Sequence, residues 1–139
     1  MKISVLSVIA VLLLGALPVQ SQVVFEETGI KAVFQKAREE NKLVFIDCYT
    51  SWCGPCKKML KEVFSRKDIG EYMNTRFVNY KQDMEQEEGK ELAGKYGVEV
   101  YPTFFILDAA GEVRHKMVSS FFCSYFCSSC FSCSNVITF

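Results

Sequence analysis

The chain has 139 residues, half of them hydrophobic, which suits one domain with short extensions. Its 16 lysines and arginines balance 16 aspartates and glutamates, so the formal net charge at pH 7 is zero. With this balance and no basic patch in the sequence, we expect no nucleic-acid partner.

The first segment has the composition of a secretory leader. Lys2 is followed by an uncharged run from Ile3 to Leu17, and Val19 and Ser21 are small enough for cleavage before Gln22. The apolar run of about 15 residues is shorter than the roughly 20 that a membrane-spanning helix needs. We therefore predict a signal peptide over residues 1–21, with an uncleaved membrane anchor as the alternative. After cleavage, we expect no membrane attachment and a periplasmic location, where disulfides persist.

The pattern of residues 22–118 alternates between helices and strands. Apolar side chains at helical spacing predict a helix over Thr28–Asn41, and an apolar run predicts a central strand over Leu43–Cys48. The later expectations are a helical turn or two at Asp68–Asn74, a strand at Phe77–Tyr80, an acidic loop at Gln82–Gly89, a helix at Lys90–Tyr96 that Gly97 stops, and a hairpin of Thr103–Leu107 and Val113–Val118. This order predicts an α/β fold with a central mixed sheet flanked by helices.

A pair of cysteines follows the central strand, in the sequence Trp52-Cys53-Gly54-Pro55-Cys56-Lys57. One apolar face at helical spacing continues from it, through Cys56, Met59, Leu60, Val63 and Phe64. Cys53 is therefore expected at a helix N-terminus, where free amides and the helix dipole favour a thiolate. Half of a zinc site is the alternative interpretation of C-x-x-C, but a strand before the motif and a helix after it favour a redox pair.

Two further residues extend this pattern. Asp47 lies inside the apolar strand, where a carboxylate is costly, and Pro102 opens a later strand. Asp47, the cysteine motif and Pro102, in this order, closely resemble the thioredoxin superfamily from about Val23 to Val118. Within it, the chain looks most like secreted thioredoxin-like domains, such as the C-terminal reductase domain of thiol:disulfide interchange proteins.

The resemblance implies a thioredoxin-like fold and a thiol–disulfide oxidoreductase. Its implied partners are proteins with disulfides and a thiol–disulfide electron donor or acceptor protein; a monomer is expected, without cofactor or metal. The Gly54-Pro55 insert is typical of reducing members. Cys53 is then the nucleophile and the more exposed sulfur, and Cys56 is the resolving thiol.

The remaining site residues are also assigned from the resemblance. Asp47 is expected to accept the proton of Cys56, directly or through water; a structural carboxylate hydrogen-bonded to backbone is the alternative. Trp52, Tyr101 and Pro102 are expected to contact substrate, with Pro102 after a cis peptide bond and core packing as the alternative role for Trp52. Lys57 completes the motif.

Three residues outside the motif carry further expectations. Lys81 matches the position where relatives place a lysine near the buried carboxylate, and a solvated lysine at the end of a strand is the alternative. Cys48, on the central strand, is expected to be an inert core residue. His115, the only histidine, is expected at the surface.

The sequence changes character after Val118. Sixteen consecutive residues, Ser119 to Ser134, are only Ser, Phe, Cys or Tyr. They lack the charged face of the amphipathic final helix that the family has here, so we predict that this helix is missing or replaced. The four amino acids share codons that begin with T and end in a pyrimidine, which suggests a frameshift artefact over residues 119–139. Cys130 and Cys133 would formally complete a Cys₄ zinc set, so a zinc-binding or redox-inactive module on the same scaffold is the alternative function.

Overall fold

The computed structural model describes residues 22–118. The predicted signal peptide, the predicted tail and the expected loss of a final helix lie outside these residues. In chain order the elements are β1 (Phe25–Glu26), α2 (Ile30–Glu40), β2 (Leu43–Tyr49), α3 (Gly54–Glu62), α4 (Lys67–Arg76), β3 (Phe77–Asp83), α5 (Glu87–Tyr96), β4 (Thr103–Leu107) and β5 (Val113–Val118).

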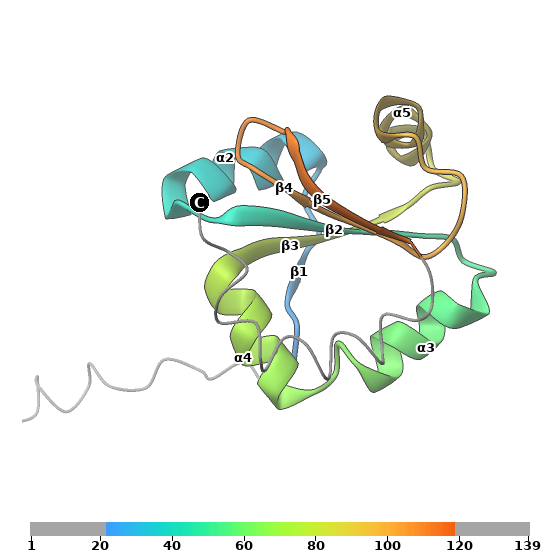
Figure 1. The fold of residues 1–139 in the computed structure, drawn as a ribbon, viewed down its shortest axis with the longest axis horizontal. Coiled ribbons are helices and arrows are strands. Elements are labelled where there is room, and N and C mark those ends of the chain that lie inside the picture. Colours follow the sequence, from blue (N-terminus) through green and yellow to red (C-terminus); the bar gives the residue numbers. More distant parts are fainter. Residues whose placement is uncertain (1–21, 119–139) are drawn as a thin grey trace, which may run out of the picture.

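The five strands form one mixed sheet in the order β1-β3-β2-β4-β5. Strands β1, β3 and β2 are parallel, whereas β4 pairs antiparallel with both β2 and β5. Helices α2 and α5 cover one face of this sheet, and α3 and α4 cover the other (Figure 1). The predicted α/β class and mixed sheet flanked by helices are therefore confirmed.

Two apolar clusters hold the layers together. On one face, Val33 and Ala37 of α2 and Leu92 of α5 pack against the sheet. On the other face, Met59 of α3 and Met73 of α4 pack against it. Burial of these side chains on both faces supplies the main driving force for the fold and fixes how each helix lies on the sheet.

The central strand β2 is buried on both sides, as the apolar run Leu43–Ile46 predicts. Successive side chains of a strand point to opposite faces. Val44, Ile46 and Cys48 accordingly pack in the cluster under α2 and α5, whereas Phe45 packs in the cluster under α3 and α4. The same alternation directs Asp47 to the face that carries α3, which is the helix of the cysteine pair.

The prediction for the apolar face of α3 is wrong at one residue, Leu60, and it extends the helix beyond its actual end. Leu60 is 44% exposed, while Met59 is buried. Helix α3 ends at Glu62, where Val63 is the C-cap, so Val63 and Phe64 reach the core from beyond the helix. Because the chain leaves the helix there, the helical period no longer determines which side chains face the sheet.

The prediction of an acidic loop at Gln82–Gly89 is also wrong. Gln82 and Asp83 extend β3 because they pair with Cys48 and Tyr49 of β2, and Glu87 already begins α5. Pairing with a buried central strand outweighs the low strand propensity of acidic residues. Helix α4 likewise extends beyond the predicted Asp68–Asn74. The short strand β1 was not predicted, since two residues carry no periodic signal.

Left-handed residues end two of the helices. Asn41 caps α2 with a φ of 51°, and Gly97 caps α5 with a φ of 64°. Glycine adopts this conformation without steric cost, so the prediction that Gly97 stops the helix is confirmed. The N-terminus of α2 is capped by a side chain of another helix: Glu88 of α5 accepts a hydrogen bond from the Ile30 amide at 3.0 Å.

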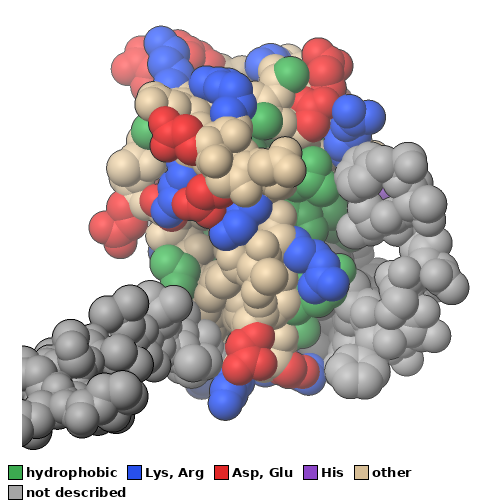
Figure 2. Space-filling view, turned by 90° about the vertical axis from the view of Figure 1, so that its left-hand side faces the viewer, with side chains coloured by type: hydrophobic (Ala, Val, Ile, Leu, Met, Phe, Trp, Pro, Cys, Tyr) green, Lys and Arg blue, Asp and Glu red, His purple; other side chains and the backbone are tan. Residues whose placement is uncertain are grey.

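Figure 2 shows one face of the molecule, on which charges of both signs are mixed. On the side drawn in Figure 2, lysines and arginines alternate with aspartates and glutamates, and small apolar patches lie between them. This face therefore carries no single-sign field of the kind that steers a polyanion.

Candidate active site

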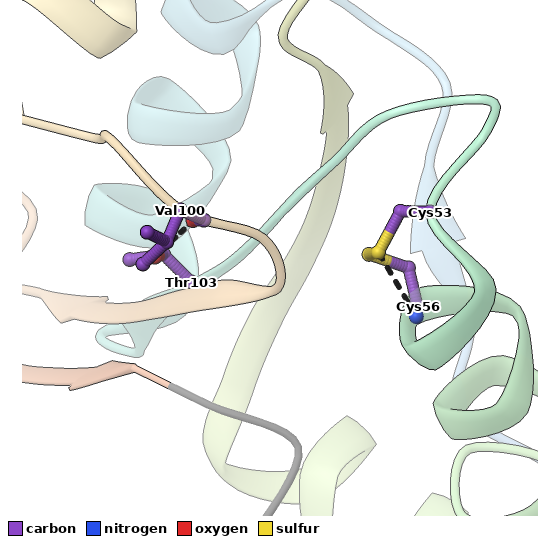
Figure 3. The surroundings of a disulfide bond; sticks show 4 residues. All are labelled: Cys53, Cys56, Val100 and Thr103. Atoms are coloured by element: carbon purple, nitrogen blue, oxygen red, sulfur yellow. Dashed lines mark hydrogen bonds between the residues drawn. A yellow bond between two sulfur atoms is a disulfide. The ribbon is translucent and has the colours of Figure 1, made fainter.

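The cysteine pair lies at the start of α3, shortly after the end of β2. Cys53 is the N-cap of the helix, and Pro55 lies within its first turn, where a missing amide proton costs nothing. The structure joins Cys53 and Cys56 in a disulfide (Figure 3). The Cys56 amide donates a hydrogen bond to Cys53 Sγ at 3.1 Å. A sulfur in this position can receive negative charge from bond cleavage, because a free amide of the helix N-terminus already points at it.

The predicted difference in exposure between the two cysteines is absent. Cys53 is 3% exposed and Cys56 is 5% exposed, so both are buried in the disulfide form. The disulfide and the amide bond to Cys53 Sγ hold that sulfur against the first turn of α3 rather than toward solvent. Attack on a partner therefore requires Cys53 to be uncovered when the disulfide opens.

The loop before β4 lies next to the motif. The Tyr101–Pro102 bond is cis, as predicted, and the Thr103 hydroxyl donates to the Val100 carbonyl at 2.7 Å. Figure 3 draws this loop and the disulfide together. The rings of Tyr101 and Trp52 meet edge to face with centroids 6.0 Å apart, which joins the loop to the residue before Cys53.

Trp52 is a surface residue rather than part of the core. Its side chain is 66% exposed, so core packing, the alternative role for this residue, is wrong. The indole Nε1 donates to Glu85 Oε1 at 2.9 Å, and Ser51 Oγ lies 3.3 Å from the other oxygen of the same carboxylate. Glu85, in the turn after β3, holds the exposed ring in place. The sequence did not point to Glu85, because nothing local distinguishes it from the neighbouring acidic residues.

Asp47 is buried beneath the cysteine pair. It is 4% exposed, and within residues 22–118 its Oδ1 has no hydrogen-bond partner. A hollow of about 160 Å³ contains this carboxylate together with Cys56; its lining comprises Asp47, Tyr49, Thr50, Ser51, Cys56, Lys57, Leu60 and Lys81. The expected proximity of Asp47 and Cys56 is therefore present, and the unpartnered oxygen argues against a purely structural carboxylate.

Burial and one lysine set the protonation of this carboxylate. Burial raises the pKa of Asp47 to about 7, and the opposing attraction of the Lys81 ammonium keeps the pKa from rising further. Lys81 is paired in register with Asp47 across β2 and β3, and β3 continues two residues beyond it. The alternative of a lysine at the end of the strand is thus wrong. A carboxyl with a pKa near neutrality can exchange a proton at physiological pH.

Of the other sequence candidates, Lys57 also lines the hollow that contains the Asp47 carboxylate. Gly54 and Lys57 are exposed in the first turn of α3. Cys48 is the free cysteine of the described residues; it lies under α2 and α5, and burial together with Asp47 raises the pKa of its thiol. His115 is exposed on β5, as predicted. Within residues 22–118, no group of three or more His, Cys, Asp or Glu side chains could hold a metal ion.

Replacing Lys81 by methionine should raise the pKa of Asp47 above its value of about 7, because the one attraction that opposes desolvation is removed. Carbon-detected NMR titration of the Asp47 carboxyl measures this directly. Lys58→Met is the matched control, since Lys58 is exposed on α3 and pairs with Glu62. An unchanged Asp47 pKa in Lys81→Met would show that the ammonium does not act on this carboxyl.

Taken together, the mixed sheet between two pairs of helices, the cysteine pair at a helix N-terminus and the adjacent cis-proline loop define a thioredoxin-like protein. Comparison with protein families agrees: the family model of the thioredoxin-like domain matches residues 30–120. The chain therefore belongs to the thioredoxin-like family.

Individual relatives include both small and large proteins. Thioredoxin H4 of Arabidopsis thaliana is 38% identical over 85 residues, which cover 61% of this chain and 66% of the relative. Protein disulfide-isomerase 1 of Dictyostelium discoideum is 35% identical over 81 residues, which cover 58% of this chain and 22% of the relative. The chain thus spans slightly under two thirds of the first relative and about a fifth of the second.

One solved structure is similar over almost its whole length. It is the solution structure of a proposed disulphide-isomerase from Bacteroides thetaiotaomicron, with a TM-score of 0.65 and 38% identity. The match covers 79% of this chain and 98% of that one. This structural similarity agrees with the family match, which places the chain in the thioredoxin-like family.

Proposed function

We propose that this chain is a thiol–disulfide oxidoreductase that reduces disulfides in other proteins through Cys53 and Cys56. The observation that carries the proposal is the cysteine pair at the start of α3, with the Cys56 amide bonded to Cys53 Sγ and Asp47 in the hollow that Cys56 lines. Proteins named thioredoxin and protein disulfide-isomerase are among its relatives. Both names belong to enzymes that act on protein disulfides.

The reaction begins with the reduced pair. The Cys53 thiolate attacks one sulfur of a substrate disulfide, the substrate S–S bond breaks, and its other sulfur leaves as a thiolate. Cys56 then loses its proton to Asp47 and attacks Cys53 Sγ. The mixed disulfide breaks, the second substrate sulfur leaves as a thiolate, and Cys53 and Cys56 end in the disulfide seen in the structure. Two electrons pass from the cysteine pair to the substrate.

Several features support net reduction. The Gly54-Pro55 insert resembles that of reducing members, and one protein of similar fold, thioredoxin f2, has been solved in complex with ferredoxin:thioredoxin reductase. The exposed Trp52, held by Glu85 beside the cis-proline loop, offers an apolar surface next to Cys53 for a substrate segment. We propose that the protein acts as a monomer on such segments, with a thiol–disulfide protein as electron donor.

The location of the reaction is part of the proposal. The leader-like composition of residues 1–21 supports export and a periplasmic site. None of the helices within residues 22–118 is both long and apolar enough to cross a membrane. N-terminal sequencing of the protein from a periplasmic extract tests this part: a mature chain that begins at Gln22 is expected, and a chain that retains residues 1–21 in the membrane fraction would contradict it.

The activity is tested by insulin reduction with dithiothreitol, combined with metal analysis of the purified chain. Precipitation of insulin chains at a rate well above the uncatalysed rate, with no bound zinc, is the expected result. Stoichiometric zinc without reductase activity would instead support the metal-binding alternative. Absence of both would support a redox-inactive binding module.

A further inference from the structure

Thr50 carries a buried hydroxyl that takes part in none of the reaction steps described above. It directly follows β2 and is 2% exposed, and its Oγ1 has no hydrogen-bond partner within residues 22–118. Only two other buried side-chain atoms of this part of the chain share that property, and one of them is Asp47 Oδ1. An unsatisfied buried polar group costs roughly 1–3 kcal/mol, so two such groups in one place require an explanation.

Both atoms belong to residues that line the same hollow, together with Cys56. Its volume of about 160 Å³ exceeds the roughly 10–15 Å³ that a cavity must offer to hold one water. A buried water also needs two to four polar partners. The Thr50 hydroxyl can both donate and accept, the Asp47 carboxylate accepts, and the thiol of reduced Cys56 donates weakly. The hollow therefore has the room and the polar groups that a bound water requires.

We propose that Thr50 is a positioning residue that holds a water between Cys56 and Asp47 and so carries the proton transfer that precedes release of the substrate. The proposal rests on the proposed function and on the route through water expected for Asp47, and it adds Thr50 as the residue that holds the water. Thr50 touches neither the substrate nor the sulfurs in this step; it acts through the water.

The backbone around Thr50 suits this role. The Thr50 carbonyl accepts a hydrogen bond from the Cys53 amide at 3.2 Å, so the residue is tied to the cysteine motif. A β-branched side chain has restricted χ1 rotamers, which keeps its hydroxyl in one direction. Serine would keep the hydroxyl and lose this restriction, while valine would keep the shape and lose the hydroxyl.

The step balances without any further reactant. The Cys56 thiol gives its proton to the water, and the water gives a proton to Asp47 Oδ1. The Cys56 thiolate then attacks Cys53 Sγ, and the substrate sulfur leaves with the electron pair of the broken bond. The other titratable groups on the hollow are Lys57, Lys81 and Tyr49. A lysine side chain is a hydrogen-bond donor without an acceptor, so neither lysine serves as the proton acceptor. Burial together with nearby carboxylates raises the pKa of the Tyr49 phenol, so the phenol stays protonated.

The test compares release of a preformed mixed disulfide with attack on a substrate disulfide, each as a single turnover at pH 7. Thr50→Val should slow release about five- to tenfold, the effect of one lost hydrogen bond of ordinary strength, and leave attack unchanged. Thr50→Ser should retain most of the wild-type release rate. In an Asp47→Ala background, Thr50→Val should cause no further slowing, because the acceptor of the proton is already absent. Thr75→Val, the same change on the exposed face of α4, is the control.

A second measurement does not depend on activity. NMR titration of the Asp47 carboxyl in the oxidised protein should give a higher pKa in Thr50→Val than in wild type, since a hydrogen bond to the charged carboxylate is lost. Thr50→Ala, a second variant without the hydroxyl, should show the same shift. If release rate and Asp47 pKa both match wild type in these variants, the proposal is wrong. If wild-type protein reduces no disulfide while the pKa still responds to Thr50, the proposed function fails and the water site stands.

Discussion

Cys56→Ser should capture substrate proteins as stable mixed disulfides, whereas Cys53→Ser should capture none. Cys53 is the sulfur to which a helix amide donates, so it receives the charge of the thiolate and makes the first bond to substrate. Without Cys56, that bond has no internal thiol to break it. Insulin reduction should fall on the order of a thousandfold or more in both variants, because each removes a partner in the same bond exchange. Captured proteins are counted on non-reducing gels.

Cys48→Ala is the matched control for this experiment. Cys48 is buried, packs under α2 and α5, and has a thiol pKa raised by burial, so it should form no mixed disulfide. The Cys48→Ala variant should therefore capture no substrate and reduce insulin at the wild-type rate. Equal capture by Cys53→Ser and Cys56→Ser would contradict the assignment of Cys53 as the nucleophile.

Asp47→Ala should slow release of the mixed disulfide at pH 7 by on the order of a hundredfold, the lower end of what a positioned general base contributes. Attack by Cys53 should change much less, because the carboxylate lies in the hollow that Cys56, not Cys53, lines. Rapid-mixing experiments with a preformed mixed disulfide separate the two steps. Equal slowing of both steps would show that Asp47 acts on the pair as a whole rather than on the proton of Cys56.

The same substitution should change how stability depends on pH. Folding raises the pKa of Asp47 from the 3.8 of an ordinary aspartate to about 7, so between these values the folded state binds more protons than the unfolded state. Wild-type stability should consequently fall as pH rises from about 4 to about 7, by on the order of 4 kcal/mol, and then level off. Asp47→Ala should lack this decline and be the more stable protein at pH 8.

Urea unfolding of the oxidised protein at pH 4 and pH 8 measures this difference. Asp47→Asn is a useful second variant, since it removes the charge and keeps the size of the side chain. Its unfolding free energy should also lose the decline of the wild type between the two pH values. A clear loss of stability in Asp47→Ala at pH 8, in place of the gain, would identify Asp47 as a structural hydrogen-bonding residue.

Much of the fold follows from local pattern. The apolar run at Leu43–Cys48 predicted the central strand, and Gly97 predicted a helix end that the structure confirms. These two features depend on side-chain periodicity and on the backbone freedom of glycine, so nearby residues are enough to predict them. The cysteine pair at the start of a helix followed in the same way. The cis bond before Pro102 was instead expected from the family resemblance, and the structure confirms it.

Contacts between distant segments could not be predicted in this way. The bond from Trp52 to Glu85 joins residues 33 positions apart, and the register of β2 on β3 brings Lys81 to Asp47. The exposure of Leu60 also escaped prediction, because helical spacing says which residues share a face but not where the sheet ends beneath it.

The sequence by itself thus determined the order of strands and helices after β1, the identity of the redox pair and the buried carboxylate, since each depends on residue type and local spacing. Only the tertiary structure decided that Cys53 and Cys56 are both buried and that Lys81 opposes the effect of burial on the Asp47 pKa. It also decided that Thr50 lines the same hollow as Asp47 and Lys81. The physical reason is that burial, electric field and cavity shape at one atom are set by every element packed around it. Those neighbours come from β2, β3 and α3, and only the packing of the sheet against the helix brings them together.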